Sequence, residues 1–451
     1  MPNAVRFNSN YPCITRSEEY YHRAEGLIPA ATQTLAKGPG QYVRGVAPKY
    51  LHSGKGCHVW DVDGNEYIDL VMGVGPISLG YQYPAVDDAI REQLGRGITF
   101  SLMHPLEVEV AELVRDCIPG ADMVRFSKTG CDVTSAAVRL ARAYTNRERV
   151  LCCGYHGWHD WYIGVTERSD GVPAVVRDLT RTFRYNDADS VIDAIDEQTA
   201  CVILEPVVFT LPEADFLQRL REICDRNGTL LIFDEMWTGF RLAIGGAQQH
   251  FGVRADLACY SKAIANGMPL SVLAGRRDVM ELCEKDIFFF TTFGGEALSL
   301  AAAKATIGEL RDKSVPESLA RQGRKLRLGY NAIASQLRMN YTSCSGPDCR
   351  SAVGFDSEAG NPLELKSLMQ QEMIRHGILW SGFHNLSYSH EDSDIEQILR
   401  AYEDVLPIVK AAVEKGSVRS CLLGEPVEPV FTRSSANPGI ARKAADGGRS
   451  N

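Results

Sequence analysis

The chain has 451 residues, of which 45% are hydrophobic and 23% are charged, so it can bury a large core and form two or three domains. Its formal net charge of -9 gives no general attraction to nucleic acid or to anionic lipid, so we expect small molecules as partners. The N-terminus has no apolar signal region, and no apolar run approaches the roughly 20 residues that cross a bilayer. We therefore expect a cytoplasmic protein whose 13 cysteines are mostly free thiols.

The middle of the chain alternates between two kinds of segment. Amphipathic segments predict helices, and the second of them ends in an Asn-Gly signal. Short apolar stretches between them are too short for helices and predict buried strands. The alternation indicates an α/β fold with a mainly parallel sheet. In chain order we expect a helix over 132–146, strands over 149–153 and 201–208, a helix over 214–228, and strands over 229–235, 257–262 and 270–275.

The C-terminal third predicts a smaller second domain. Amphipathic helices are expected over 363–377 and 392–416, packed with the N-terminal segment. The last residues are polar and rich in Gly, Ser and Ala, so we expect a mobile tail. The expected divisions are an N-terminal segment (1–85) that joins the small domain, a large α/β domain (86–305), a C-terminal small α+β domain (306–430) and the tail (431–451).

Polar residues stand at the ends of three expected strands. Glu205, Asp234 and Lys262 each have an ordinary interpretation as a strand-terminating residue, but ligands of parallel sheets bind beyond the carboxyl ends of the strands. A lysine with a carboxylate suits pyridoxal phosphate (PLP), which forms a Schiff base with a lysine and needs a carboxylate at its pyridine nitrogen. The cofactor's phosphate would need a helix start, which Thr129, Gly130 and Cys131 supply.

These residues belong to an ordered series of motifs that includes "FDEMWTGFR" (233–241), "YSKAIANGMPLSVLAGR" (260–276) and "TTFGGEALSLAAA" (291–303). Through them the chain resembles the class III, fold-type I PLP aminotransferases, and most closely the glutamate-1-semialdehyde aminomutase-like branch. The resemblance implies a seven-stranded, mainly parallel sheet flanked by helices, with a smaller α+β domain. It also implies a homodimer with the active sites at the subunit interface.

The resemblance assigns roles to individual residues. Lys262 would form the Schiff base, Asp234 would pair with the pyridine nitrogen, and Tyr155 would stack on the ring. Arg44 in "QYVRGV" would bind a substrate carboxylate, although it also has an ordinary interpretation as a surface arginine. The remaining expected cofactor contacts are Thr129, Gly130, Cys131, His156, Glu205, Met236 and, from the neighbouring subunit, Thr292.

The chain departs from the aminomutase pattern at three places. Cys131 replaces a hydroxyl residue in the phosphate loop, Val74 replaces a tryptophan, and Phe209-Thr210 replaces a Gly-Asn. We therefore expect an aminotransferase that moves an amino group from a donor such as glutamate to a keto or aldehyde acceptor, such as a sugar or secondary-metabolite intermediate. The alternatives are an aminomutase, a PLP-dependent epimerase or decarboxylase, and a binding protein without turnover.

Three further patterns are weak. Cys344 and Cys349 lack the spacing of a zinc site, and "GVGPISLG" is more typical of an ordinary turn than of a nucleotide loop. His156, His159 and Asp160 have the residue types of metal ligands, but no strand or helix fixes their relative positions. We expect no metal.

Overall fold

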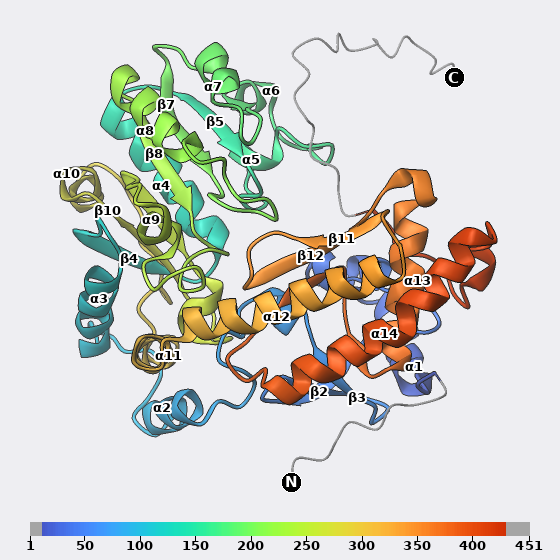
Figure 1. Cartoon of the computed structure of the whole chain (residues 1–451). Coiled ribbons are helices and arrows are strands. Elements are labelled where there is room, and N and C mark those ends of the chain that lie inside the picture. The colour runs from blue at the N-terminus through green and yellow to red at the C-terminus, as the bar shows by residue number, and fades with distance from the viewer. Residues whose placement is uncertain (1–10, 430–451) are drawn as a thin grey trace, which may run out of the picture.

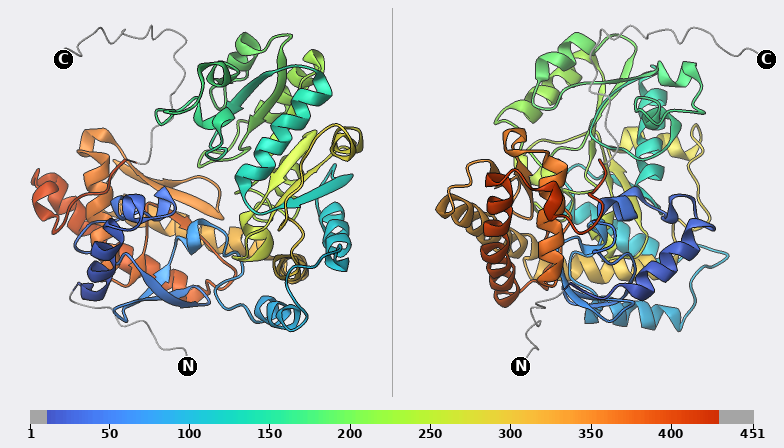
Figure 2. Two further views of the ribbon diagram at one scale, coloured as in Figure 1. Left: turned by 180° about the vertical axis from the view of Figure 1, so that it is seen from behind. Right: turned by 90° about the vertical axis from the view of Figure 1, so that its right-hand side faces the viewer.

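The computed structural model describes residues 11–429, which form a larger and a smaller body (Figure 1). The larger body is built around one extended sheet, and the smaller body carries two short sheets beside long helices from the C-terminal part of the chain. The first elements of the chain lie with these C-terminal helices in every view (Figure 2). The tail expected over 431–451 lies outside the described residues.

The large sheet has seven strands in the order β4-β10-β9-β8-β7-β5-β6. β10 is antiparallel to both of its neighbours, whereas the β9-β8-β7-β5-β6 run is parallel, so the mainly parallel sheet is confirmed. All five expected strands form, at β5 (Arg149–Cys153), β7 (Thr199–Leu204), β8 (Leu230–Asp234), β9 (Leu257–Tyr260) and β10 (Ser271–Gly275). The sequence did not predict the outer strands β4 (Met123–Ser127) and β6 (Thr180–Thr182), which are mostly less buried and carry an arginine each.

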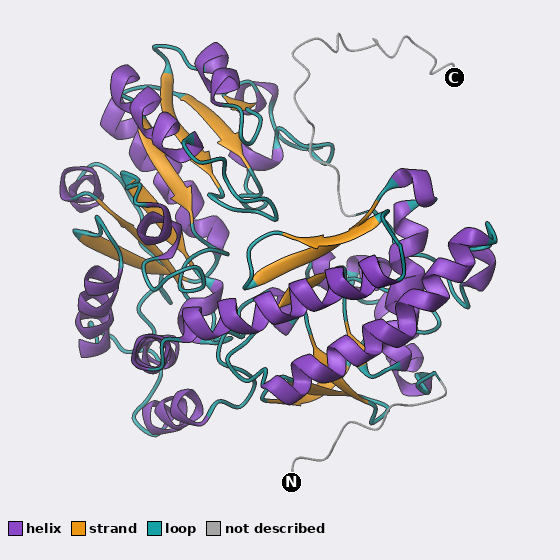
Figure 3. Ribbon diagram, in the orientation of Figure 1, coloured by secondary structure: helices purple, strands orange, loops and turns teal. Residues whose placement is uncertain are grey.

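Helices cover this sheet (Figure 3). Both expected helices form, and α8 ends at Gly228, whose φ of +63° suits a left-handed cap. The buried side of α4 consists mainly of small and branched apolar residues, which lets the helix pack closely on the strands. The helices of this body are α2 (Pro84–Leu94), α3 (Pro105–Cys117), α4 (Gly130–Thr145), α5 (Asp160–Ile163), α6 (Ala174–Arg177), α7 (Ala188–Ala194), α8 (Phe216–Asn227), α9 (Gly246–Phe251), α10 (Arg277–Met280) and α11 (Ala297–Asp312).

The smaller body joins both ends of the described chain. β13 pairs in parallel with β3, with Ile378 opposite Ile68, so the N-terminal and C-terminal segments share one sheet. Its strands are β1 (Leu51–Lys55), β2 (His58–Asp61), β3 (Glu66–Asp69) and β13 (Ile378–Leu379), and then β11 (Thr342–Ser345), β12 (Arg350–Phe355) and β14 (Phe383–Asn385). Its helices are α1 (Thr15–Glu25), α12 (Val315–Gln336), α13 (Pro362–Arg375) and α14 (Asp392–Glu414). Across residues 11–429, every helix is too short or too polar to cross a membrane.

Candidate active site

Asp234, the last residue of β8, is held in a fixed orientation. Its Oδ2 lies 2.8 Å from Nδ1 of His156, and its Oδ1 accepts the backbone N–H of Met236 at 3.1 Å. Nε2 of His156 donates to the carbonyl oxygen of Cys153 at 3.2 Å. The two ring nitrogens of His156 therefore link the Asp234 carboxylate to the end of β5. Asp234 and His156 are each 2% exposed, so this pair is buried.

Lys262 follows β9 and begins a short 3-10 turn, η5 (Lys262–Ala265). Its φ of +47° is in the left-handed region, which a lysine adopts when its surroundings enforce it. The turn is tied to the neighbouring loop because Ser78 Oγ donates to the carbonyl of Ala263 at 3.1 Å. Asn266 likewise accepts the N–H of Leu79 at 2.8 Å. The lysine is therefore held at the carboxyl edge of the sheet.

The environment of Lys262 disfavours its charge. Burial lowers the pKa of the amine to about 7, and the nearby Arg350 guanidinium adds to this lowering while Glu205 opposes it. The side chain remains half-buried. A large fraction of the amine is therefore neutral, and so nucleophilic, near neutral pH.

Glu205 and Tyr155 meet at the ends of β7 and β5. The backbone N–H of Tyr155 donates to Oε2 of Glu205 at 2.8 Å. Gly154 makes this approach possible: its φ is +113°, and a Cβ there would lie 2.8 Å from the same oxygen. Burial raises the pKa of the Tyr155 hydroxyl, and Cys131, Glu205 and Asp234 add to this increase, which shows that the four side chains are neighbours.

The N-terminus of α4 is braced by its own first turn. Oδ2 of Asp132 accepts the N–H of Thr129 at 2.8 Å and the hydroxyl of Ser127 at 2.8 Å. Gly130 faces Met236, since a Cβ at Gly130 would lie 3.0 Å from the Met236 sulfur. A rigid helix start of this kind attracts an anion through its N–H groups and the helix dipole.

The Cys131 thiol is directed towards the loop that follows β5. The sulfur lies against Gly157, because a Cβ at that position would overlap it. Burial raises the pKa of this thiol, so it is protonated at neutral pH. All 13 cysteines, Cys131 included, lie in the described residues and are free thiols, as predicted.

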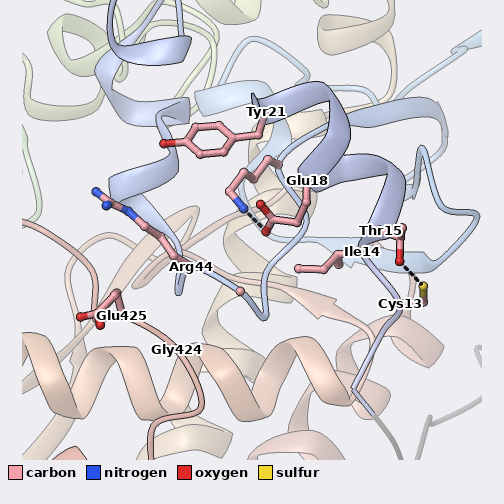
Figure 4. Close-up of a pocket in the computed structure, with 10 residues that line it drawn as sticks. Cys13, Ile14, Thr15, Glu18, Tyr21, Arg44, Gly424 and Glu425 are labelled. Carbon is pink, nitrogen blue, oxygen red and sulfur yellow. Dashed lines mark hydrogen bonds and ion pairs between the residues drawn. The ribbon is translucent and has the colours of Figure 1, made fainter. Parts of the chain in front are cut away.

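Two expected site residues lie apart from this cluster. Arg44 pairs with Glu428 and lines a separate pocket of about 570 Å³ beside α1, where Tyr21 and Glu425 also lie (Figure 4). Thr292 is exposed in the segment between α10 and α11. Within one chain, the structure joins neither residue to Lys262 by any contact that it records.

The weaker sequence patterns do not form a metal or nucleotide site around Lys262. His159 bonds to Ser135 Oγ at 2.6 Å, whereas His156 faces Asp234. Cys344 and Cys349 are buried thiols of the smaller body. The "GVGPISLG" segment (73–80) starts within a 3-10 turn, η4 (Met72–Val74), and continues without a helix or strand, as expected of an ordinary turn. Among residues 11–429, the potential metal ligands that do group together are Cys57, His58 and Asp394, in the smaller body.

The sequence missed an aromatic and cationic group beside Lys262. Nζ of Lys262 lies 4.2 Å from the ring centroid of Trp237, and Cζ of Arg350 lies 3.4 Å from the same centroid. Arg350 also lies 4.2 Å from the ring of Phe209. Trp237 could have been noticed because it closely follows the Asp234 strand end. No local pattern marks Arg350, which begins a strand of the smaller body.

The chain is similar to several characterised proteins. The model of the family described as "Aminotransferase class-III" matches residues 43–341. The chain is 32% identical to the 3-aminobutyryl-CoA aminotransferase of Cloacimonas acidaminovorans, over 88% of this chain and 98% of that protein. It is 35% identical to the glutamate-1-semialdehyde 2,1-aminomutase of Alkaliphilus oremlandii, over 87% of this chain and 99% of that protein.

Solved structures show the same fold. The PLP internal aldimine form of the FumI protein of Sphingopyxis sp. MTA144 superposes with a TM-score of 0.83 at 28% identity, covering 92% of this chain and 99% of that one. A β-phenylalanine aminotransferase from Variovorax paradoxus gives a TM-score of 0.78 at 26% identity, covering 88% of this chain and 94% of that one. From its sequence, its fold and these relatives, the chain belongs to the class III aminotransferases, which are PLP-dependent enzymes.

Proposed function

We propose that this enzyme transfers an amino group from a donor such as glutamate to a separate keto or aldehyde acceptor, with Lys262 as the catalytic amine. The observation that carries the proposal is the position of Lys262. Its amine, with a pKa lowered to about 7, shares one neighbourhood with the Asp234 carboxylate and the N-terminus of α4.

The residues of this neighbourhood fit PLP. The cofactor requires an amine for its aldehyde, an anion for its pyridine nitrogen and a cradle for its phosphate. Lys262, Asp234 and the α4 start at Gly130 offer these groups in turn. Asp234 is buried, so its negative charge is stabilised best when a cationic ring nitrogen joins His156 beside it.

When bound, PLP supplies a ring that withdraws electrons from the substrate carbon that carries the amine. Besides holding the cofactor's aldehyde, Lys262 would take a proton from that carbon as a base and give it back as an acid. A pKa of about 7 suits both halves of this task, because the amine is ready to accept a proton and its conjugate acid is ready to give one.

The surrounding residues orient these groups. His156 keeps the Asp234 carboxylate in one rotamer, and the Met236 N–H fixes the second oxygen. The Tyr155 ring, which is 48% exposed, is available to cover one face of the cofactor. Thr129 belongs to the phosphate cradle, and Glu205 lies on the side of Tyr155, where its carboxylate can accept a hydrogen bond.

Two differences favour a separate acceptor over an internal amino shift. Aminomutation requires a small substrate to stay enclosed while the cofactor changes form. Here Val74 stands in place of a tryptophan, in a turn whose next residue, Gly75, lies directly against Trp237. Phe209-Thr210 replaces a Gly-Asn on the loop after β7, and the Phe209 ring lies against the Arg350 guanidinium. These changes widen one wall and add an aromatic one, which suits a bulkier acceptor.

The test is the donor half-reaction. The holoenzyme is supplied with glutamate, alanine or another amino donor and no acceptor. We expect the visible absorbance of the bound cofactor to disappear while one equivalent of the keto acid is released.

A second candidate, aminomutation, is favoured by the 35% identity to the glutamate-1-semialdehyde aminomutase of Alkaliphilus oremlandii. Its test uses glutamate-1-semialdehyde alone. Efficient conversion to 5-aminolevulinate, with no keto acid released from any donor, would establish aminomutation and refute transamination.

We further propose that the active unit is a homodimer. Five large apolar side chains, Leu102, Met103, Phe288, Phe290 and Phe293, are more than half exposed on two segments. The two segments lie side by side, because the backbone N–H of Ala297 donates to the carbonyl of Ile98 at 2.9 Å. An exposed apolar patch of this kind favours association. Thr292 lies within it, so a second subunit bound there would bring its own Thr292 close to the first subunit's cofactor.

A further inference from the structure

Arg350 belongs to the smaller body but reaches the active site of the larger one. It begins β12, and its guanidinium carbon lies 3.4 Å from the Trp237 ring centroid and 4.2 Å from that of Phe209. Nη1 donates to the Val208 carbonyl at 3.3 Å. The residue is 8% exposed. A long cationic side chain is thus held between the loops that leave β7 and β8.

Those two loops follow the two carboxylates of the proposed site. Trp237 lies three residues after Asp234, and Phe209 lies four residues after Glu205. Nζ of Lys262 lies 4.2 Å from the Trp237 ring that also contacts Arg350, so the two cations share one aromatic neighbour. The Arg350 guanidinium is therefore within the reach of a small substrate whose amine reacts beside Lys262.

This placement is unfavourable for the enzyme without substrate. Two cations near one another in a partly buried site repel, and the Arg350 charge contributes to the lowered pKa of Lys262. A substrate anion that binds Arg350 offsets that repulsion. The arrangement therefore stabilises an anionic substrate more than a neutral one.

The geometry also indicates the kind of anion. Contacts with the Trp237 and Phe209 rings occupy much of the flat surface of the guanidinium, so a ligand meets this group along its N–H edge. A carboxylate lies in the plane of that edge and accepts two parallel hydrogen bonds. Arg44, which the family resemblance indicated for this role, pairs with Glu428 beside α1 instead.

We propose that Arg350 binds the carboxylate of the amino substrate and that Trp237 and Phe209 hold its guanidinium in the orientation for that contact. This assignment rests on the proposed transaminase function. It makes Arg350 a specificity residue, contributed by the smaller body, that selects amino acids over amines without a carboxylate.

The experiment compares the wild-type holoenzyme with Arg350→Gln, Arg350→Lys and, as a charge-matched control in the same body, Arg324→Gln on the exposed side of α12. The probes are acetate, succinate and glutarate, which have carboxylates but no amine, so they bind without reacting. Their Kd values are measured from the change in the visible absorbance of the bound cofactor, and KM and kcat are measured with the most active amino-acid donor.

We expect Arg350→Gln to raise the Kd of the best carboxylate probe and the donor KM by about tenfold or more, because a charge-assisted bidentate contact is lost. Arg350→Lys should give Kd and KM values between those of the wild type and Arg350→Gln, because lysine keeps the positive charge but cannot make two parallel hydrogen bonds to a carboxylate. Arg324→Gln should match the wild type. The cofactor absorbance should persist in all four proteins.

Other outcomes overturn the inference. Unchanged carboxylate binding in both Arg350 variants, a fall in kcat with the same KM, or a wild-type enzyme that binds none of the three probes would each do so. A larger loss in Arg44→Gln than in Arg350→Gln would return the role to Arg44. If Arg350→Gln fails to fold, Arg350→Lys decides by the same criteria. A wild-type enzyme with no cofactor absorbance would instead refute the proposed function.

Discussion

Replacing Lys262 with methionine should stabilise the cofactor-free protein at and below neutral pH. The pKa of Lys262 is about 7 in the folded protein and 10.5 in an unfolded chain, so the unfolded state binds more protons between these two values. The wild-type protein therefore gains stability as the pH rises from 7 to 10.5. Below pH 7 the full cost of placing the ammonium in this site is present. Methionine has a similar length and carries no such cost.

The magnitude follows from the same two values. A lowering from 10.5 to about 7 corresponds to about 5 kcal/mol at 1.36 kcal/mol per pH unit. Lys262 is half-buried rather than enclosed, so solvent screens part of this cost, and we expect about 2 kcal/mol. The advantage of the methionine variant should therefore be about 2 kcal/mol at pH 6 and close to zero at pH 10.5.

The assay is urea unfolding of cofactor-free protein at a series of pH values, for the wild type, Lys262→Met and a control, Lys285→Met, in which an exposed lysine is replaced. The control should follow the wild type at every pH. With PLP added, Lys262→Met should lack both the visible absorbance and catalysis. If the stabilities of Lys262→Met and the wild type differ by the same amount at pH 6 and pH 10, the lysine is not desolvated as the structure indicates.

Three further predictions concern other residues of the proposed site and its surroundings. His156→Phe keeps a ring but has no N–H for the Asp234 carboxylate and should lower kcat/KM of the donor half-reaction by about 10- to 100-fold, so an unchanged rate would exclude an orienting role. Thr292→Ala should speed the loss of PLP on dilution if this residue completes a phosphate site across a dimer, whereas a fully active monomer at sedimentation equilibrium would contradict that arrangement. Gly157→Ala should destabilise the protein by about 1–3 kcal/mol in denaturant unfolding, because φ is +105° and the new Cβ would overlap the Cys131 sulfur; a change below about 0.5 kcal/mol would show that the loop yields easily.

The strand-end residues can be located from the sequence because their signals are local. A short apolar run followed by Asp234 or Lys262 indicates a buried strand and the polar side chain at its end. Parallel strands place those ends at one edge of the sheet, so the sequence alone predicts that these residues are neighbours. The start of α4 at Gly130 is also visible, as a glycine before an amphipathic segment.

Other features depend on contacts between distant parts of the chain. The hydrogen bond between His156 and Asp234 joins two strand ends whose side-chain directions no periodicity specifies. The left-handed backbone of Lys262 is held by a loop from elsewhere in the chain, through Ser78 and Leu79. Such contacts follow from the packing of completed elements, which the pattern of any one segment does not contain.

Arg44 and Arg350 show most clearly what local sequence patterns indicate and what only the tertiary structure decides. The sequence indicated the fold and the cofactor and predicted the role of Lys262, because strand ends, a helix start and the family's motifs can be recognised locally. The family resemblance indicated Arg44 as a substrate arginine, a role that stays a prediction; the tertiary structure pairs Arg44 with Glu428 and places Arg350 against the Trp237 ring, which the sequence did not indicate. The reason is that the position of Arg350 depends on how the smaller body packs against the loops after β7 and β8, and that packing is a property of the whole chain.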